Sequence, residues 1–141
     1  MSVIGECNPA RDVSYSLTSD KEGALLYRAT VKHVVVTYDL KTLKAEPATD
    51  VKKIDEVDFA GALVGDWAFF FHNEAHALRS TASFEVAAEG KLHFMICGLA
   101  PGAWDIWRNG WLEDTSSGVD ARSGVLYFEG RAGSYFIRRS G

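Results

Sequence analysis

The sequence predicts an all-β fold: a two-sheet antiparallel β-sandwich, Ig-like or of related topology, with about eight or nine strands. Three observations lead to this prediction. Apolar and polar residues alternate in short runs, as they do along a strand with one buried face. Turn-forming residues interrupt these runs at intervals of about 8–12 residues. Aromatic residues make up 12% of the chain, and such side chains pack well on the pleated surface of a sheet.

The 141 residues are expected to form one domain, 1–141, because a chain of that length can bury a single hydrophobic core. Residues 1–12 are expected to be a tail or N-terminal extension. They contain Gly5, Asn8 and Pro9 and show no clear period.

Residues 23–30 and 31–40 predict the first pair of strands. Their apolar positions change from odd to even numbers near Lys32 and His33. Since side chains along a strand have a period of two, this change requires a bulge, a bend or a turn at that point.

The middle of the chain predicts strands that differ in burial. Residues 51–57 carry many charges, which indicates an edge or solvated strand. Residues 60–65 are expected to form a turn or loop. Residues 66–72 are apolar on both faces, so we expect this strand in the centre of a sheet with both faces covered.

Glycine-containing segments predict further hairpins. Two pairs of strands are expected to be joined in this way: residues 80–87 and the strand that contains Leu92, through 88–90; and residues 125–129 and 134–139, through 130–133.

The dipeptide Asn109-Gly110 is the strongest hairpin signal, because a type I′ turn needs positive φ at both central residues. It connects a strand at 103–108 with a strand that begins at Trp111. The register that follows places three pairs opposite one another: Arg108 and Trp111, Trp107 and Leu112, and Asp105 and Asp114.

The composition argues against two classes of partner. The net charge is −4 and no run of Lys or Arg exceeds two residues, so we expect no nucleic acid. No apolar stretch approaches the roughly 20 residues of a membrane helix, so we expect no membrane. The first ten residues also lack the basic start and apolar centre of a signal peptide. The compartment stays open between the cytosol and, for a piece of a longer chain, secretion.

The two cysteines, Cys7 and Cys97, are too few for a disulfide scaffold or a zinc ligand set. A bridge between them would tie down the N-terminal segment. Two free thiols, with Cys97 at the end of a strand, are the alternative and the default expectation.

One histidine cluster deserves consideration as a metal site. His72, Glu74 and His76 could share one face of an extended segment and hold a metal ion, although a solvated hairpin loop is the expected structure there. We therefore expect no metal and no cofactor.

The sequence also offers little for catalysis. It contains no Gly-x-Ser-x-Gly elbow, and His93 lies about two pleats from Cys97 along one strand, beyond hydrogen-bond reach. Asp105 and Asp114 would form a carboxylate pair for glycosidic chemistry, or simply a solvated hairpin end. We expect no catalytic residue.

The aromatic residues of the Asn109-Gly110 hairpin are the best candidates for binding a ligand. Trp107 and Trp111, with Arg108 and Asp105 beside them, could stack on a sugar ring and bind its hydroxyls. The alternative is structural: Trp104 belongs to the core, and Trp107 or Trp111 caps the sandwich or contacts a neighbouring domain.

Several segments together resemble a known family. They are residues 67–72, 84–86, 98–106, 109–110, 124–130 and 133–136. Among them, the run Gly98-Leu99-Ala100-Pro101-Gly102 before Trp104 has a pattern that recurs in many Ig-like and carbohydrate-associated modules. Over about residues 22–139 the chain is similar to the C-terminal β-sandwich of heparinase II/III-like polysaccharide lyases.

This resemblance implies an accessory sandwich in a larger extracellular or periplasmic lyase. The family's catalytic groups lie in a helical toroid and an adjoining sheet domain, and neither matches this chain, so no catalytic residue carries over. The expected function is a non-catalytic accessory domain that stabilises its parent enzyme or contacts glycan.

Two other functions remain as alternatives. A structural or self-associating module would bind a neighbouring domain or a second copy through exposed strand faces, for example around Trp107 and Phe70. A small metal-dependent or hydrolytic enzyme centred on His72, Glu74 and His76 is the third.

Overall fold

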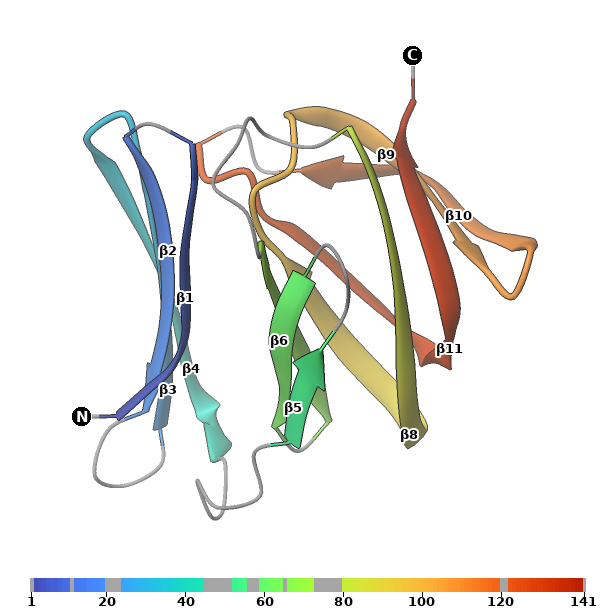
Figure 1. The fold of residues 1–141 in the computed structure, drawn as a ribbon, viewed down its shortest axis with the longest axis horizontal. Coiled ribbons are helices and arrows are strands. Elements are labelled where there is room, and N and C mark those ends of the chain that lie inside the picture. The colour runs from blue at the N-terminus through green and yellow to red at the C-terminus, as the bar shows by residue number, and fades with distance from the viewer. Residues whose placement is uncertain are drawn as a thin grey trace.

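Two β-sheets face each other in the computed structural model, and no helix occurs among its described residues (Figure 1). The structure describes residues 2–10, 12–19, 24–44, 52–55, 59–64, 66–72, 80–119 and 122–140. The predicted two-sheet, all-β class is therefore confirmed, and these described ranges contain eleven strands where eight or nine were expected.

The first sheet contains four antiparallel strands in sequence order. They are β1 (Ser2–Ala10), β2 (Val13–Ser19), β3 (Ala24–Val31) and β4 (Val34–Lys44). Burial alternates along β2, as expected for a strand with one face on the core.

The second sheet contains seven strands in the order β10-β9-β11-β8-β7-β6-β5. Their bounds are β5 (Lys52–Asp55), β6 (Phe59–Val64), β7 (Trp67–His72), β8 (Thr81–Ile96), β9 (Gly102–Arg108), β10 (Trp111–Val119) and β11 (Leu126–Arg139). The strands β7 and β8 run parallel, whereas the other pairings of this sheet are antiparallel.

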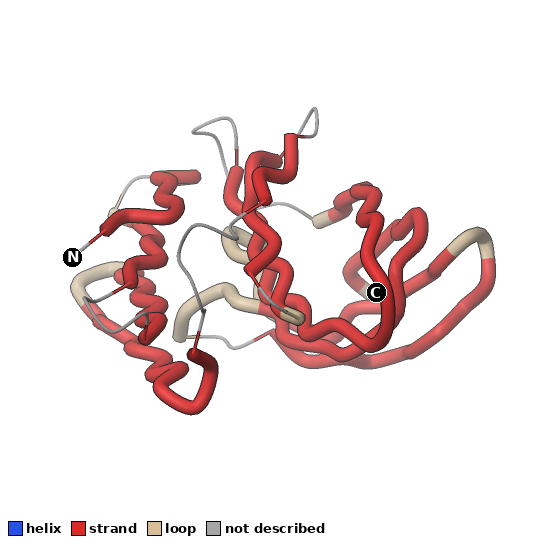
Figure 2. Tube along the Cα trace, turned by 90° about the horizontal axis from the view of Figure 1, so that it is seen from below, coloured by secondary structure: helices blue, strands red, loops and turns tan. Residues whose placement is uncertain are grey.

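The seven-stranded sheet is strongly curved (Figure 2), and its two faces bury different cores. The hollow face encloses a core that includes Phe70, Phe94 and Trp104. The outer face packs against the four-stranded sheet and contributes Phe69 and Phe71 to a second core. This arrangement confirms that residues 66–72 form a central strand covered on both faces, and β5 confirms the predicted edge strand.

Close contacts hold the two sheets together. A side chain at Gly5 would place its Cβ 2.5 Å from a ring carbon of Phe71, so glycine lets β1 approach β7 closely. The hydroxyls of Tyr15 and Tyr38 both hydrogen-bond to Ser123, which precedes β11.

Three sequence expectations about local structure are corrected by the fold. The first concerns the tail expected at residues 1–12, within which Ser2–Ala10 form the strand β1. The pairing of β1 with β2 shifts register between Val3 and Gly5 and again between Cys7 and Ala10, which removes the regular period that would have marked a strand.

The second correction concerns residues 60–65, where β6 replaces the expected turn. A Cβ on Gly61 would lie 2.0 Å from the carbonyl oxygen of Phe69, so this glycine permits a close approach of two strands and does not mark a turn.

The third correction concerns the hairpins expected at 88–90 and 130–133. Instead, β8 and β11 are long, continuous strands that pair with each other. Between the pairs Arg131–Lys91 and Gly133–Val86, Ala132 stands opposite residues 87–90, and Gly90 has φ 78°. The segment that contains Gly90 therefore forms a bulge within the long pairing of β8 with β11.

The turn required near Lys32 is confirmed. Lys32 and His33 join β3 to β4 with φ values of 49° and 72°, as a two-residue hairpin turn requires.

Candidate functional site

The predicted Asn109-Gly110 hairpin forms with the expected turn, since φ is 54° at Asn109 and 85° at Gly110. Arg108 lies opposite Trp111 and Trp107 lies opposite Leu112, as predicted.

The predicted carboxylate pair does not form. The register of β9 and β10 shifts after Leu112, so Asp114 lies opposite Ile106 instead of Asp105. Asp105 lies opposite Arg138 of β11 on its other side. The expectation that Asp105 faces Asp114 is therefore wrong, because a bulge adds a residue that the sequence pattern did not reveal.

Trp104 belongs to the core, as the structural alternative predicted. Its side chain is fully buried, and its indole Nε1 donates a hydrogen bond to the carbonyl oxygen of Ala100 at 3.0 Å. It is therefore not available to a ligand.

The four predicted ligand-binding residues divide between the two faces of the hairpin. On one face, Trp111 is 78% exposed beside Arg108, whose Nε donates to Glu113 at 2.7 Å. On the other face lie Trp107 and Asp105. The ring of Trp107 packs 5.5 Å from that of Phe136 and 5.1 Å from the guanidinium of Arg138.

A groove that the sequence did not predict lies where the two sheets meet. It has a volume of about 620 Å³. Its lining includes Tyr38 of β4 together with residues of the seven-stranded sheet and its connections: Trp67, Met95, Val119, Val125 and Tyr127. Three aromatic side chains therefore border one open apolar space.

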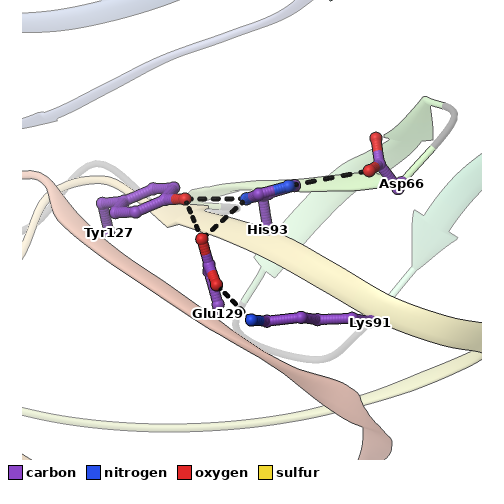
Figure 3. A network of polar contacts seen from close by, with 5 residues as sticks. All are labelled: Asp66, Lys91, His93, Tyr127 and Glu129. Atoms are coloured by element: carbon purple, nitrogen blue, oxygen red, sulfur yellow. Dashed lines mark hydrogen bonds and ion pairs between the residues drawn. The ribbon is translucent and has the colours of Figure 1, made fainter.

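A polar network extends from Tyr127, which lines this groove, to His93, Glu129, Asp66 and Lys91 (Figure 3). The Nδ1 atom of His93 lies 2.7 Å from the Tyr127 hydroxyl, which donates to Glu129 at 3.2 Å. The other ring nitrogen of His93 lies 3.6 Å from the carboxylate of Asp66. Lys91 completes the network through an ion pair of 2.5 Å with Glu129.

Strand pairing explains how these residues meet. Trp67 of β7 lies opposite His93 of β8, and His93 lies opposite Glu129 of β11. Tyr127 is two residues before Glu129 and projects from the same face. The ring of His93 stacks on that of Trp67 with their centroids 4.6 Å apart, which fixes the imidazole between an aromatic and two carboxylates.

The ionisation of the network follows from these contacts. Partial burial and the hydrogen bond to Glu129 raise the pKa of the Tyr127 hydroxyl, so it stays protonated and acts as a hydrogen-bond donor. The neighbouring Lys91 ammonium, together with the Tyr127 hydroxyl, lowers the pKa of Glu129. At neutral pH this carboxylate is an acceptor.

Alternation along the strands was the only signal that could have identified this site. The residues His93, Tyr127 and Glu129 occupy outward positions between buried residues of β8 and β11. That pattern indicates which face they share, but it does not indicate which strands are neighbours.

Several absences can be stated for the part of the chain that the structure describes. No group of three or more His, Cys, Asp or Glu side chains there could hold a metal ion. No helix among those residues is long and apolar enough to cross a membrane. Glu74, His76 and the side chain of His72 lie outside the described residues, so the hypothesis of a metal site there stays untested.

Comparison with known proteins gives the family. A search of curated proteins found no match. The model of the heparinase II C-terminal domain matches residues 53–139, which include nearly all of the seven-stranded sheet and leave the four-stranded sheet outside. The match covers more than half of the chain and confirms the resemblance, over a shorter range than expected. The chain therefore belongs to the heparinase II C-terminal domain family, an accessory domain of a larger polysaccharide lyase-like protein in which a neighbouring domain is implied.

Proposed function

We propose that this chain is a non-catalytic accessory domain that contacts glycan in the groove between its two sheets. The observation that carries the proposal is the combination of Tyr38, Trp67 and Tyr127 around one groove with a polar network at its border. Sugar rings have apolar C–H faces that pack on aromatic side chains, and their hydroxyls bind nearby polar groups.

The size of the groove supports this function. Its volume of about 620 Å³ lies within the range of roughly 300–1,000 Å³ that is typical of small-molecule sites.

Tyr127 presents both an aromatic face and a polar end to the groove. Its hydroxyl stays protonated and donates to Glu129, which holds the ring in place at the border of the groove. A ring held in this way is suited to pack on the apolar face of a sugar.

The charges beside the groove indicate the type of glycan. Asp66 and Glu129 are both partly exposed, and the one lysine of the network, Lys91, is already paired with Glu129. The local charge is therefore negative when His93 is neutral, and it would repel a polyanionic chain. A neutral glycan is the better ligand.

Affinity electrophoresis through gels that contain neutral or sulfated polysaccharides tests this function. We expect neutral gels to retain the protein and Trp67→Ala to weaken retention at least about tenfold, since an aromatic contact is removed. Tyr127→Ala gives a second variant with a more exposed side chain. Trp111→Ala is the matched control, because Trp111 is exposed and does not line the groove.

Two outcomes would contradict the proposal. Absence of retention in every gel would reject glycan contact. If Trp111→Ala or Trp107→Ala lost retention while Trp67→Ala kept it, the glycan site would lie on the hairpin, where the sequence predicted it.

A second candidate function is protein interaction through the hairpin. Trp111, Leu112 and Phe136 are 78%, 53% and 39% exposed, and such apolar exposure favours contact with the neighbouring domain or with a second copy. Light scattering over a concentration series tests self-association. Growth of the mass with concentration, reversed by Leu112→Ser, would support it, and a strict monomer would count against it.

A further inference from the structure

The two cysteines of the chain meet in the core between the two sheets. Cys7 lies in β1 of the four-stranded sheet and Cys97 directly follows β8 of the other. Both side chains are buried, no disulfide joins them, and their sulfur atoms lie 3.5 Å apart. The Cys97 thiol also lies 3.3 Å from the carbonyl oxygen of Phe70.

The backbone around Cys7 allows the remaining approach. A disulfide needs a sulfur–sulfur distance of about 2.05 Å, so the two sulfurs must move together by about 1.5 Å. The strand β1 lies at the edge of its sheet, and its register shifts on both sides of Cys7. Such an irregular edge strand can move without disturbing a regular ladder. Gly5 already brings this strand close to Phe71.

We propose that Cys7 and Cys97 are a disulfide site, and that oxidation joins the two sheets by a covalent bond. The oxidant is a low-molecular-weight disulfide such as oxidised glutathione. Cys7 is 9% exposed and Cys97 is fully buried, so Cys7 reacts first.

The reaction consists of two thiol–disulfide exchanges. The Cys7 thiolate attacks one sulfur of the oxidant, forms a mixed disulfide and releases the first small thiolate. The Cys97 thiolate then attacks the sulfur of Cys7, forms the Cys7–Cys97 bond and releases the second. The two protons of the cysteines leave on the two small thiols, and the two electrons of the oxidation reduce the oxidant.

The bond would stabilise the packing of the sheets. The two cysteines are 90 positions apart, so the cross-link closes a long loop and restricts the unfolded chain strongly. Since Cys7 lies outside the matched region 53–139, the bond would also attach the four-stranded sheet to the family domain.

The experiment places the chain in glutathione buffers from fully reduced to fully oxidised. The protein is then unfolded, alkylated and measured by intact mass and peptide mapping. We expect the oxidised protein to lose two hydrogens, about 2 Da, and to give one Cys7–Cys97 peptide. Its unfolding midpoint should rise by roughly 10 °C and return after reduction with dithiothreitol.

Cys7→Ser and Cys97→Ser are the matched variants. Neither should show a redox-dependent midpoint, and the comparison of oxidised with reduced wild type does not depend on how well either variant folds. Two alkylated cysteines under oxidising conditions, a stable glutathione adduct on Cys7, or disulfide-linked dimers would overturn the proposal. A Cys7–Cys97 bond that lowers the midpoint would also overturn it.

Discussion

The hydroxyl of Tyr15, in the four-stranded sheet, donates a hydrogen bond to the main-chain carbonyl oxygen of Ser123, just before β11 of the seven-stranded sheet. The hydroxyl of Tyr38 meets the side chain of the same serine at 2.8 Å. Tyr27 lies between these two tyrosines on β3, with its ring stacked on that of Phe69. Among the described residues its buried hydroxyl makes no hydrogen bond of ordinary geometry, and its polar neighbours include the weakly hydrogen-bonding Cys97 thiol.

The Tyr15 hydroxyl is hydrogen-bonded and the Tyr27 hydroxyl makes no hydrogen bond of ordinary geometry within the described part of the chain, so removing them should have opposite effects on stability. Tyr15→Phe should lower the free energy of unfolding by about 1–3 kcal/mol, because it leaves a buried carbonyl oxygen unpaired. Tyr27→Phe should cause no loss and should raise it by up to about 1 kcal/mol, because it removes a buried polar group that is only weakly paired. Urea denaturation followed by circular dichroism measures both. Equal losses in the two variants would refute this account of the interface.

The tryptophans predict a second contrast. Trp104→Ala should lower the free energy of unfolding by about 3–5 kcal/mol, because it leaves a cavity in the core of the curved sheet. Trp111→Ala should change it by no more than about 0.5 kcal/mol, since that side chain is 78% exposed. The same denaturation experiment checks the pair. A large loss in Trp111→Ala would show that the hairpin packs on something the structure does not contain.

Gly61 predicts the cost of a methyl group at the contact between β6 and β7. Gly61→Ala should lower the free energy of unfolding by about 1–3 kcal/mol, because its Cβ would lie 2.0 Å from a backbone oxygen. Gly118→Ala is the control, since its Cβ would meet no atom within 4 Å. Thermal unfolding of both variants measures the effect, and a Gly61→Ala protein as stable as the control would contradict the strand pairing.

The ion pair beside the groove predicts a pH effect. Lys91→Gln should raise the pKa of Glu129 towards its ordinary value, whereas Lys91→Arg, which keeps the charge, should leave it low. Carboxyl ¹³C NMR titration measures the pKa in each variant.

The sign of the linked stability follows from the lowered pKa. Ionised Glu129 favours the folded state at pH above its pKa in the unfolded chain, and this contribution disappears as the pH falls through the lower folded pKa. An unchanged Glu129 titration in Lys91→Gln would show that the pair has no electrostatic effect.

Much of the fold could be predicted where the deciding interactions are local. The Asn109-Gly110 turn fixed the pairing of Arg108 with Trp111, because a two-residue turn sets the register of its neighbours. The apolar faces of β7 likewise indicated a central strand. The structure around Gly90 could not be predicted from local sequence, because a glycine with positive φ occurs both in hairpin turns and in bulges. Only the long pairing of β8 with β11 makes it a bulge.

The candidate site could not be predicted, because it depends on contacts between distant strands. Trp67 and His93 stack because β7 pairs with β8 in parallel, a connection that the hairpin pattern did not suggest. Tyr38 joins them only because the two sheets pack face to face. The aromatic residues of the hairpin are neighbours in the sequence, so the sequence suggested them as a binding site. Those of the groove are spread over more of the chain and could not be grouped in this way.

The chain has four tryptophans, so the indole N–H signals of an NMR spectrum test glycan binding in the groove most directly. Each signal is assigned by replacing one tryptophan at a time, and a neutral oligosaccharide is then titrated into the labelled wild type. The account predicts that the Trp67 signal shifts and saturates, while those of Trp104, Trp107 and Trp111 do not. A spectrum in which no signal moves, or in which only the hairpin tryptophans respond, would contradict it.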